Sequence, residues 1–318
     1  MKIWIWIILA IVAILLIGFV LLCRMIGKNF MDNLRHRKPG EPFNPAIDVS
    51  FYMNGPVPKV AEKGMAYMKT LPHEDVYITS RDGLKLHATL FPAEGDTKKY
   101  VVGIHGFQSH AWSEYAPHAE YYQTHGFGIL LPDDRAHGES EGQYITMGIK
   151  DRHDCIDWAN YLIGRFGKDI QVLLHGVSMG GATVLNASGE PDLPAQVFGV
   201  VSDCGFTSAS ASFENQIQSL YHIPPEFPVK VSHWFALHKA GYDFDEVKPI
   251  EQVKHAKVPI LFVQGVDDIM VPKFMAEQLY EACTSRKKLV LVEHANHAES
   301  IAVAPEKYHQ AMHEMFGI

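Results

Sequence analysis

The sequence predicts an α/β protein with an open, mostly parallel β-sheet covered by helices on both faces. From residue 76 onward, short apolar runs alternate with segments of helical pattern, which is typical of this class. The runs are continuously apolar, which indicates strands buried on both faces. With 318 residues, 47% of them hydrophobic and 20% charged, the chain is long enough to bury one large core.

The expected sheet has about eight strands. Apolar stretches between residues 76 and 91 predict an antiparallel pair joined by a turn at Asp82-Gly83, where glycine tolerates a positive φ angle. Six further runs predict the parallel strands, at residues 100–104, 127–131, 170–175, 196–202, 259–264 and 288–293.

Two helices can be placed from the spacing of their apolar residues, one over residues 149–166 and one over residues 57–71. Their apolar sides are Cys155, Trp158, Ala159 and Leu162 in the first, and Val60, Met65 and Met68 in the second.

Residues 1–23 predict a single-pass membrane anchor. The stretch from Ile3 to Cys23 carries no charge and is long enough to cross roughly 30 Å of hydrocarbon as a helix. A cleaved signal peptide would end in small residues, and a lipid-attachment site would have one before Cys23. Leucines stand there instead, which disfavours both.

Positive charge around this span favours a cytoplasmic location for the rest of the chain, by the positive-inside rule. An uncleaved anchor with one leading lysine can still translocate its downstream domain, so both orientations stay open. Lys2 precedes the span, and Arg24, Lys28, Arg35, Arg37 and Lys38 follow it.

Residues 24–75 predict a stalk of extended or turning backbone with a flanking segment, because prolines interrupt the pattern. We expect the remaining residues, 76–318, to form one domain. The prolines are Pro39, Pro42, Pro45, Pro56 and Pro58.

Charge and cysteine content exclude some classes. A net charge of -8 offers no excess of Lys and Arg for nucleic acid, so no nucleic-acid partner is expected. Four cysteines, without C-x-x-C spacing, predict free thiols and not a disulfide scaffold. A pairing of Cys155 with Cys204 stays open. The oligomeric state is not predicted.

A G-x-S-x-G motif follows the predicted strand at 170–175. A serine on a sharp turn between a strand and a helix needs neighbours without a Cβ atom, and Gly176 and Gly180 flank Ser178 accordingly. The stretch after the motif can form a helix, so its context favours a nucleophile elbow over a turn with an idle serine. Ser178 is therefore the predicted nucleophile.

A serine hydroxyl needs a base, and the base needs a group that fixes its tautomer. In the chain order typical of a nucleophile elbow, an acid and then a histidine follow at the ends of later strands. The strand at 259–264 leads to Asp267 and Asp268, and the strand at 288–293 leads to His294 and His297. These residues by themselves leave both choices open.

With these motifs, the chain from about residue 76 to its C-terminus resembles an α/β-hydrolase of the serine-esterase and prolyl-oligopeptidase-like kind. The family's G-x-x-D-x-x-V-P pattern selects Asp268 as the acid, and its histidine turn selects His297, although Asn296 replaces the usual glycine. The resemblance further implies an oxyanion hole from the backbone N–H groups of Phe107 and Met179. It implies no cofactor.

The resemblance assigns supporting parts to several other residues. Asp267 is expected in a solvated turn, His294 in a structural hydrogen bond, and His105 as an organiser of its loop. Residues 133–140 match the family's D-x-R-G-x-G-x-S element, with Ala136 in place of a glycine, and are expected to buttress the elbow. A metal site at His294 and His297 is disfavoured, because no H-E-x-x-H motif is present.

The family's substrate-covering insertion corresponds to a small helical lid at about residues 205–250. Most of its aromatic residues are expected to pack the lid onto the sheet, and the others to line an apolar pocket. The chain is thus expected to hydrolyse small carboxylic esters or acyl compounds. The alternatives are a peptidase, a thioesterase or acyltransferase with the same triad, or a membrane-tethered interaction protein without catalysis.

Overall fold

The computed structural model describes residues 2–38, 55–93, 95 and 98–318. Its centre is an eight-stranded sheet in the order β1-β2-β4-β3-β5-β6-β7-β8. β1 and β2 form the expected antiparallel hairpin, β2 pairs antiparallel with β4, and the other neighbours are parallel. The strands are β1 (Glu74–Thr79), β2 (Lys85–Phe91), β3 (Lys99–Ile104), β4 (Phe127–Pro132), β5 (Gln171–Val177), β6 (Val197–Asp203), β7 (Ile260–Gly265) and β8 (Lys287–Val292).

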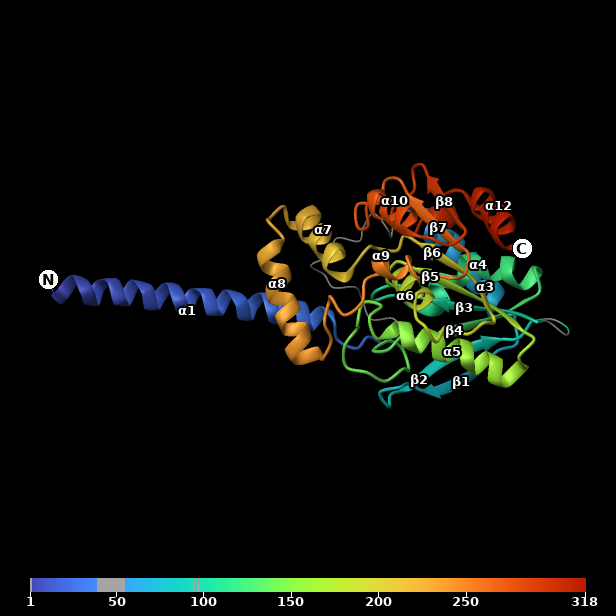
Figure 1. The fold of residues 1–318 in the computed structure, drawn as a ribbon, viewed down its shortest axis with the longest axis horizontal. Helices are drawn as coiled ribbons and strands as arrows, with labels where there is room; N and C mark the ends of the chain where they lie inside the picture. Colours follow the sequence, from blue (N-terminus) through green and yellow to red (C-terminus); the bar gives the residue numbers. More distant parts are fainter. Residues whose placement is uncertain (1, 39–54, 94, 96–97) are drawn as a thin grey trace.

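Helices cover both faces of the sheet, as predicted (Figure 1). Two separate apolar cores result, because alternate residues of one strand point to opposite faces. On β5, for example, Leu174 belongs to the core with α5 and α6, whereas Leu173 belongs to the core with α4 and α12. The covering helices are α3 (Val57–Met68), α4 (Ala111–Thr124), α5 (Asp151–Phe166), α6 (Met179–Ser188), α10 (Lys273–Ala282), α11 (Ser300–Val303) and α12 (Pro305–Phe316).

The N-terminal helix α1 (Lys2–Asn33) is longer than the predicted anchor. One stretch in the described chain, Ile3–Asn33, is long and apolar enough to cross a membrane. The expectation of extended backbone directly after residue 23 was wrong, because no proline interrupts the helix before Pro39. Pro39, Pro42 and Pro45 of the predicted stalk lie outside the described residues.

The chain after α1 is fixed to the domain. Arg35 and Arg37 form isolated β-bridges with Tyr144 and His137. The backbone N–H of Ile145 also donates to the carbonyl of Leu34, at 2.7 Å. This end of α1 is therefore joined to the loops that follow β4.

The segment predicted as a lid is mostly helical. It contains α7 (Ala209–Tyr221), α8 (Glu226–Phe235), the π-helical turn η1 (Ala236–Ala240) and α9 (Pro249–Gln252). Its aromatic residues pack onto α1 as well as onto the domain, which differs from the expectation. Phe30 of α1 contacts Phe213 and Phe244, with ring centroids 5.2 and 5.7 Å apart, because the unpredicted last turns of α1 reach the lid.

Candidate active site

Ser178 lies on the tight turn between β5 and α6. Its backbone has φ 56° and ψ -115°, a conformation that non-glycine residues rarely adopt and that costs about 1–3 kcal/mol. The backbone N–H of Ser178 donates to the carbonyl of Asp203 at the end of β6, at 2.8 Å. The neighbouring strand thereby helps to hold the strained turn.

The glycines of the motif are required by close backbone contacts. A Cβ atom on Gly176 would lie 2.0 Å from the carbonyl oxygen of Gly180, and one on Gly180 would lie 1.9 Å from that of Ile104. Neither contact can be relieved by moving a side chain. The turn therefore packs against β3, which carries the chain into the loop of Gly106 and Phe107.

His297 connects Ser178 to Asp268. Its Nε2 lies 2.8 Å from Ser178 Oγ, and its Nδ1 lies 2.8 Å from Asp268 Oδ2. The carboxylate can accept a hydrogen bond from a proton on Nδ1, and in this tautomer Nε2 is free to take the proton of the serine hydroxyl. The three residues selected through the family resemblance therefore lie in one hydrogen-bonded chain.

Asp268 is buried and held by its own turn. The backbone N–H groups of Met270 and Val271 both donate to Asp268 Oδ1 at 2.8 Å, and Gln264 Nε2 donates to Oδ2 at 3.0 Å. Asp267, by contrast, is exposed, as expected for a solvated turn. The rival carboxylate therefore lies outside the hydrogen-bonded chain.

His294 differs from its expected structural role. Its side chain is 92% exposed, and its Nδ1 lies 3.9 Å from Asp267 Oδ2. The residue has a positive φ of 62°, which turns the chain after β8 and leaves its side chain in solvent. A structural hydrogen bond was expected for His294 because it lies closer than His297 to the end of β8.

The two predicted oxyanion donors flank Ser178. Met179 is the first residue of α6, and Phe107 follows Gly106 in the loop after β3. In the described part of the chain, neither backbone N–H donates to a protein acceptor. The N–H of Gly106, which precedes Phe107, is occupied, because it donates to Glu114 Oε2 at 2.6 Å. The N–H groups of Phe107 and Met179 are thus unpaired in the described structure.

Two buried histidines organise the loop around Phe107. His105 Nε2 accepts from the backbone N–H of Asp134 at 3.1 Å, so this residue takes the organising role expected of it. His137 Nε2 accepts from the backbone N–H of Gln108 at 3.2 Å. The side chain of Gln108 in turn donates to the carbonyl of Asn33, at 2.7 Å. The oxyanion loop is therefore connected to the end of α1.

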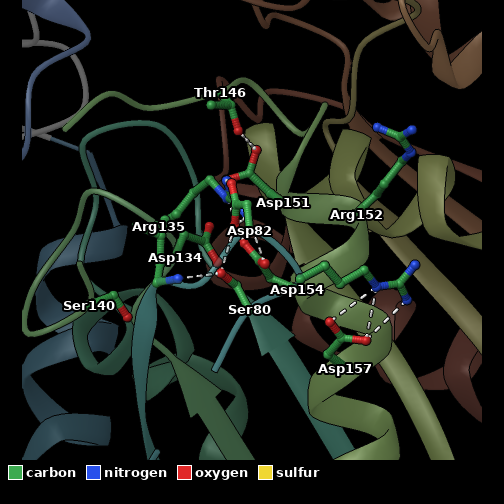
Figure 2. A network of polar contacts seen from close by, with 12 residues as sticks. Ser80, Asp82, Asp134, Arg135, Ser140, Thr146, Asp151, Arg152, Asp154 and Asp157 are labelled. Atoms are coloured by element: carbon green, nitrogen blue, oxygen red, sulfur yellow. Dashed lines mark hydrogen bonds and ion pairs between the residues drawn. The ribbon is translucent and has the colours of Figure 1, made fainter. Parts of the chain in front are cut away.

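The loop after β4 is buttressed by Arg135, which lies between Asp82 and Asp154 (Figure 2). Its Nε and Nη2 donate to the two oxygens of Asp154 at 2.6 and 2.8 Å, and its Nη1 donates to Asp82 at 2.9 Å. Such a bidentate pair fixes both position and orientation. Gly138 in the same loop leaves no room for a Cβ atom beside the Asp133 carboxylate.

The electrostatics of the site favour a charged imidazole. Burial opposes the charged form, but the Asp268 carboxylate outweighs it and holds the pKa of His297 well above its ordinary value. Burial raises the pKa of the nearby Cys204 thiol to about 11, so the thiol stays protonated near neutral pH. Ligand-type atoms of Cys204, Asp268 and His297 lie within 4.8 Å of one another, so this group beside Ser178 has the spacing that a metal ion needs.

Sequence reasoning missed three polar residues beside the triad: Glu114, Asp203 and Gln264. Asp203 is the last residue of the apolar strand β6, and Gln264 is the last but one of β7. A polar residue at the carboxyl end of a parallel strand could have indicated a site residue. Glu114 lies in the first turn of α4, where no local pattern marks it. Desolvation raises its pKa to about 7, against the opposing effect of the Gly106 N–H.

Asp203 should make stability depend on pH. Burial raises its pKa to about 7, and its Oδ1 has no hydrogen-bond partner in the described structure. The folded state therefore keeps a proton that the unfolded state releases above about pH 4, so stability falls as pH rises from there to about 7. We expect Asp203→Asn to stabilise the protein at pH 8 by about 2 kcal/mol more than at pH 5.

Urea unfolding of both proteins in the same detergent at pH 5 and pH 8, followed by circular dichroism, measures this difference. Equal stabilisation at both pH values would show that Asp203 is charged in the folded state.

Two family models match parts of this chain. Residues 95–238 match the family model described as serine aminopeptidase, S33, and residues 200–298 match the one described as serine hydrolase (FSH1). The uncharacterized protein YqkD of Bacillus subtilis is 24% identical over 222 residues, 70% of this chain and 72% of the relative. The uncharacterized membrane protein YNL320W of Saccharomyces cerevisiae is 25% identical over 221 residues, 69% of this chain and 71% of the relative.

Among solved structures, the esterase Pf2001 of Pyrococcus furiosus has a similar fold. The TM-score is 0.65 at 20% identity, covering 89% of this chain and 98% of the esterase. The strand order, the elbow at Ser178 and the two family models point to the same group. The chain therefore has the α/β-hydrolase fold and matches serine-hydrolase family models over parts of its length.

Proposed function

We propose that the protein hydrolyses carboxylic esters through an acyl-enzyme on Ser178. The observation that supports this most strongly is the position of His297, whose two ring nitrogens lie 2.8 Å from Ser178 Oγ and from Asp268 Oδ2. An activated serine of this kind performs acyl transfer. Phe107 and Met179 complete the site as donors to the oxyanion.

The reaction has two halves. Ser178 Oγ attacks the ester carbonyl carbon while its proton moves to His297 Nε2, and the N–H groups of Phe107 and Met179 stabilise the oxyanion. The bond to the leaving alcohol then breaks, and His297 returns the proton to the alcohol oxygen. In the second half, water attacks the acyl carbon while its proton moves to His297 Nε2. The bond to Ser178 Oγ then breaks, His297 returns the proton to Oγ, and the acid is released.

Covalent labelling tests this proposal. We expect a fluorophosphonate to label the full-length protein in detergent, and mass spectrometry of the digested protein to place the adduct on Ser178. Prior labelling should abolish ester hydrolysis in proportion to the adduct formed. An adduct on another serine, or no adduct on folded protein, would contradict the proposal and favour the non-catalytic tether.

A peptidase is the second candidate, because residues 95–238 match a model described as a serine aminopeptidase. Thioesters and acyl transfer to another acceptor would use the same triad. We expect p-nitrophenyl acyl esters to be cleaved faster than aminoacyl p-nitroanilides, since an alcohol leaves more readily than an amine. Faster release from the anilides would favour the peptidase.

We also propose that α1 crosses a membrane once and that the catalytic domain faces the cytoplasm. Residues 3–22 are exposed along the whole apolar run, so the protein itself does not cover them. The positive charges that follow the run support this orientation. Protease treatment of intact cells should leave the domain uncut, and digestion would place it on the outer side.

A further inference from the structure

An apolar surface on the lid lies beside α1. Outside α1, the large hydrophobic residues that are exposed in the described structure are Tyr77, Tyr221, Ile223, Phe227, Trp234, Leu237, Ile269 and Phe274. Five of these eight fall within residues 221–237, so the exposure is concentrated on the lid. We call Tyr221, Ile223, Phe227, Trp234 and Leu237 the apolar lid face.

The spacing of three of these residues indicates one stripe along α8 and η1. Phe227 and Trp234 are seven residues apart, which is two helical turns, and Leu237 follows three residues later. Trp234 is 53% exposed and Leu237 46%, which is unusual for side chains of this size on a surface in contact with water alone. A stripe of this kind is typical of a surface that contacts an apolar partner.

The contact between α1 and α8 determines the position of the apolar lid face along α1. Phe19 lies within the apolar run of α1, and its ring packs on that of Phe227 with centroids 5.6 Å apart. Arg24 is the first charged residue after the run, five residues beyond Phe19, or about 7 Å along the helix. Phe227 is thus level with the apolar run, and the lid extends past its end.

A second contact repeats this arrangement two turns further along both helices. The ring of Phe235 lies so close to Gly27 that a Cβ atom there would be 2.2 Å from it. Glycine thereby lets α8 approach the backbone of α1. Figure 1 shows α7 and α8 at the end of the domain from which α1 projects. The lid is therefore held beside α1, next to the end of the apolar run.

The residue types suit the boundary between headgroups and acyl chains. Tryptophan and tyrosine are enriched there, and lysines extend from it toward anionic headgroups. Lys230 of α8 lies between Phe227 and Trp234 on the same helix and is exposed, as are Arg24 and Lys239. Glu226 is the one acid on α8.

A packed apolar cluster also extends from this region to the elbow of Ser178. One buried cluster contains Met31 of α1, Leu34 directly after α1, and Met179 from the elbow. Phe107 and Phe235 are packed against the same cluster. The oxyanion donors, the lid and the end of the anchor therefore share one apolar environment.

We infer that the apolar lid face is inserted in the interface of the bilayer that α1 crosses, and that an amphiphilic ester in that bilayer reaches Ser178 beneath the lid. The second half of this inference rests on the proposed function. The first half depends only on α1 and the lid.

Quenching by brominated lipids tests the insertion. The full-length protein with Trp4→Phe and Trp6→Phe, which removes the tryptophans of the anchor, is reconstituted in phosphatidylcholine–phosphatidylglycerol vesicles. We expect acyl-brominated phosphatidylcholine to quench a component of its emission that disappears when Trp234→Phe is added. Equal quenching with and without Trp234 would overturn the insertion.

Kinetics test the route of the substrate. The measured quantity is the ratio of hydrolysis of a long-chain ester embedded in the vesicles to that of a soluble short-chain ester. We expect Trp234→Ser with Leu237→Ser to lower this ratio about tenfold, since both side chains lose their apolar contact with lipid. Tyr77→Ser, at an exposed apolar residue on β1, is the matched control and should leave the ratio unchanged.

The outcomes separate the two halves. An unchanged ratio in a protein whose Trp234 is quenched would overturn delivery from the bilayer and keep the insertion. A wild-type protein that hydrolyses neither ester would overturn delivery together with the proposed function, while the quenching result would still decide the insertion.

Discussion

Replacing Ser178 by alanine should lower the turnover of a short-chain p-nitrophenyl ester by about 10⁶-fold, as loss of the nucleophile does in other serine hydrolases. The reason is that His297 then has no hydroxyl to activate, although Phe107 and Met179 can still bind an oxyanion formed by water. The remaining rate should therefore exceed that of the uncatalysed reaction. Turnover with purified full-length protein measures the loss.

Folding must be kept separate from catalysis in this experiment. Alanine keeps a Cβ atom, so the strained backbone at residue 178 stays as it is, and the circular dichroism spectrum and melting temperature should be close to those of the wild type. Ser113→Ala, at an exposed serine of α4, is the control and should retain full activity. A Ser178→Ala protein with a tenth of the wild-type rate would contradict the proposed nucleophile.

Asp268→Asn should lower kcat/KM by about 10⁴-fold, because the amide can no longer fix the required tautomer of His297 or stabilise its charge. The adjacent residue offers a matched control. Asp267→Asn removes an exposed carboxylate that lies outside the hydrogen-bonded chain, and it should stay near the wild-type rate. A larger loss in Asp267→Asn than in Asp268→Asn would reverse the assignment of the acid.

Asp268→Asn and Asp267→Asn should also differ in how kcat/KM depends on pH. His297 accepts the serine proton only when it is neutral, so kcat/KM rises as pH increases through its pKa. Asp268 holds this pKa well above its ordinary value despite burial, which places the acid limb of the wild type above about pH 6.5. Asp268→Asn should move the remaining limb to lower pH, and Asp267→Asn should not. A pH profile from 5 to 9 measures both.

The chain order of the motif residues predicted which strand ends carry the triad, and the family resemblance selected Asp268 and His297 among the candidates there. Ser178, Asp268 and His297 each follow an apolar strand, and parallel strands bring their carboxyl ends together at one edge of the sheet. Sequence patterns of this kind are local. They fix which residues stand at the ends of strands, and the sheet then supplies the distances.

The remaining features depend on contacts between distant segments. Glu114 reaches Gly106 from the next helix, and Gln108 reaches Asn33, 75 residues away in sequence, so no local pattern predicts either bond. The end of α1 was placed too early for a related reason. Hydropathy marks where a membrane span ends, whereas the helix continues through polar residues until Asn33.

The attachment at the end of α1 has a consequence for how the enzyme would meet its substrate. The hydrogen bonds from Gln108 to Asn33 and from Ile145 to Leu34 join α1 to the catalytic domain without a flexible linker at this point. With α1 in a bilayer, the domain would turn about the helix axis but would not sweep through the surrounding water. Encounters would then become a two-dimensional search, whose rate depends on lateral diffusion and on the surface density of the ester.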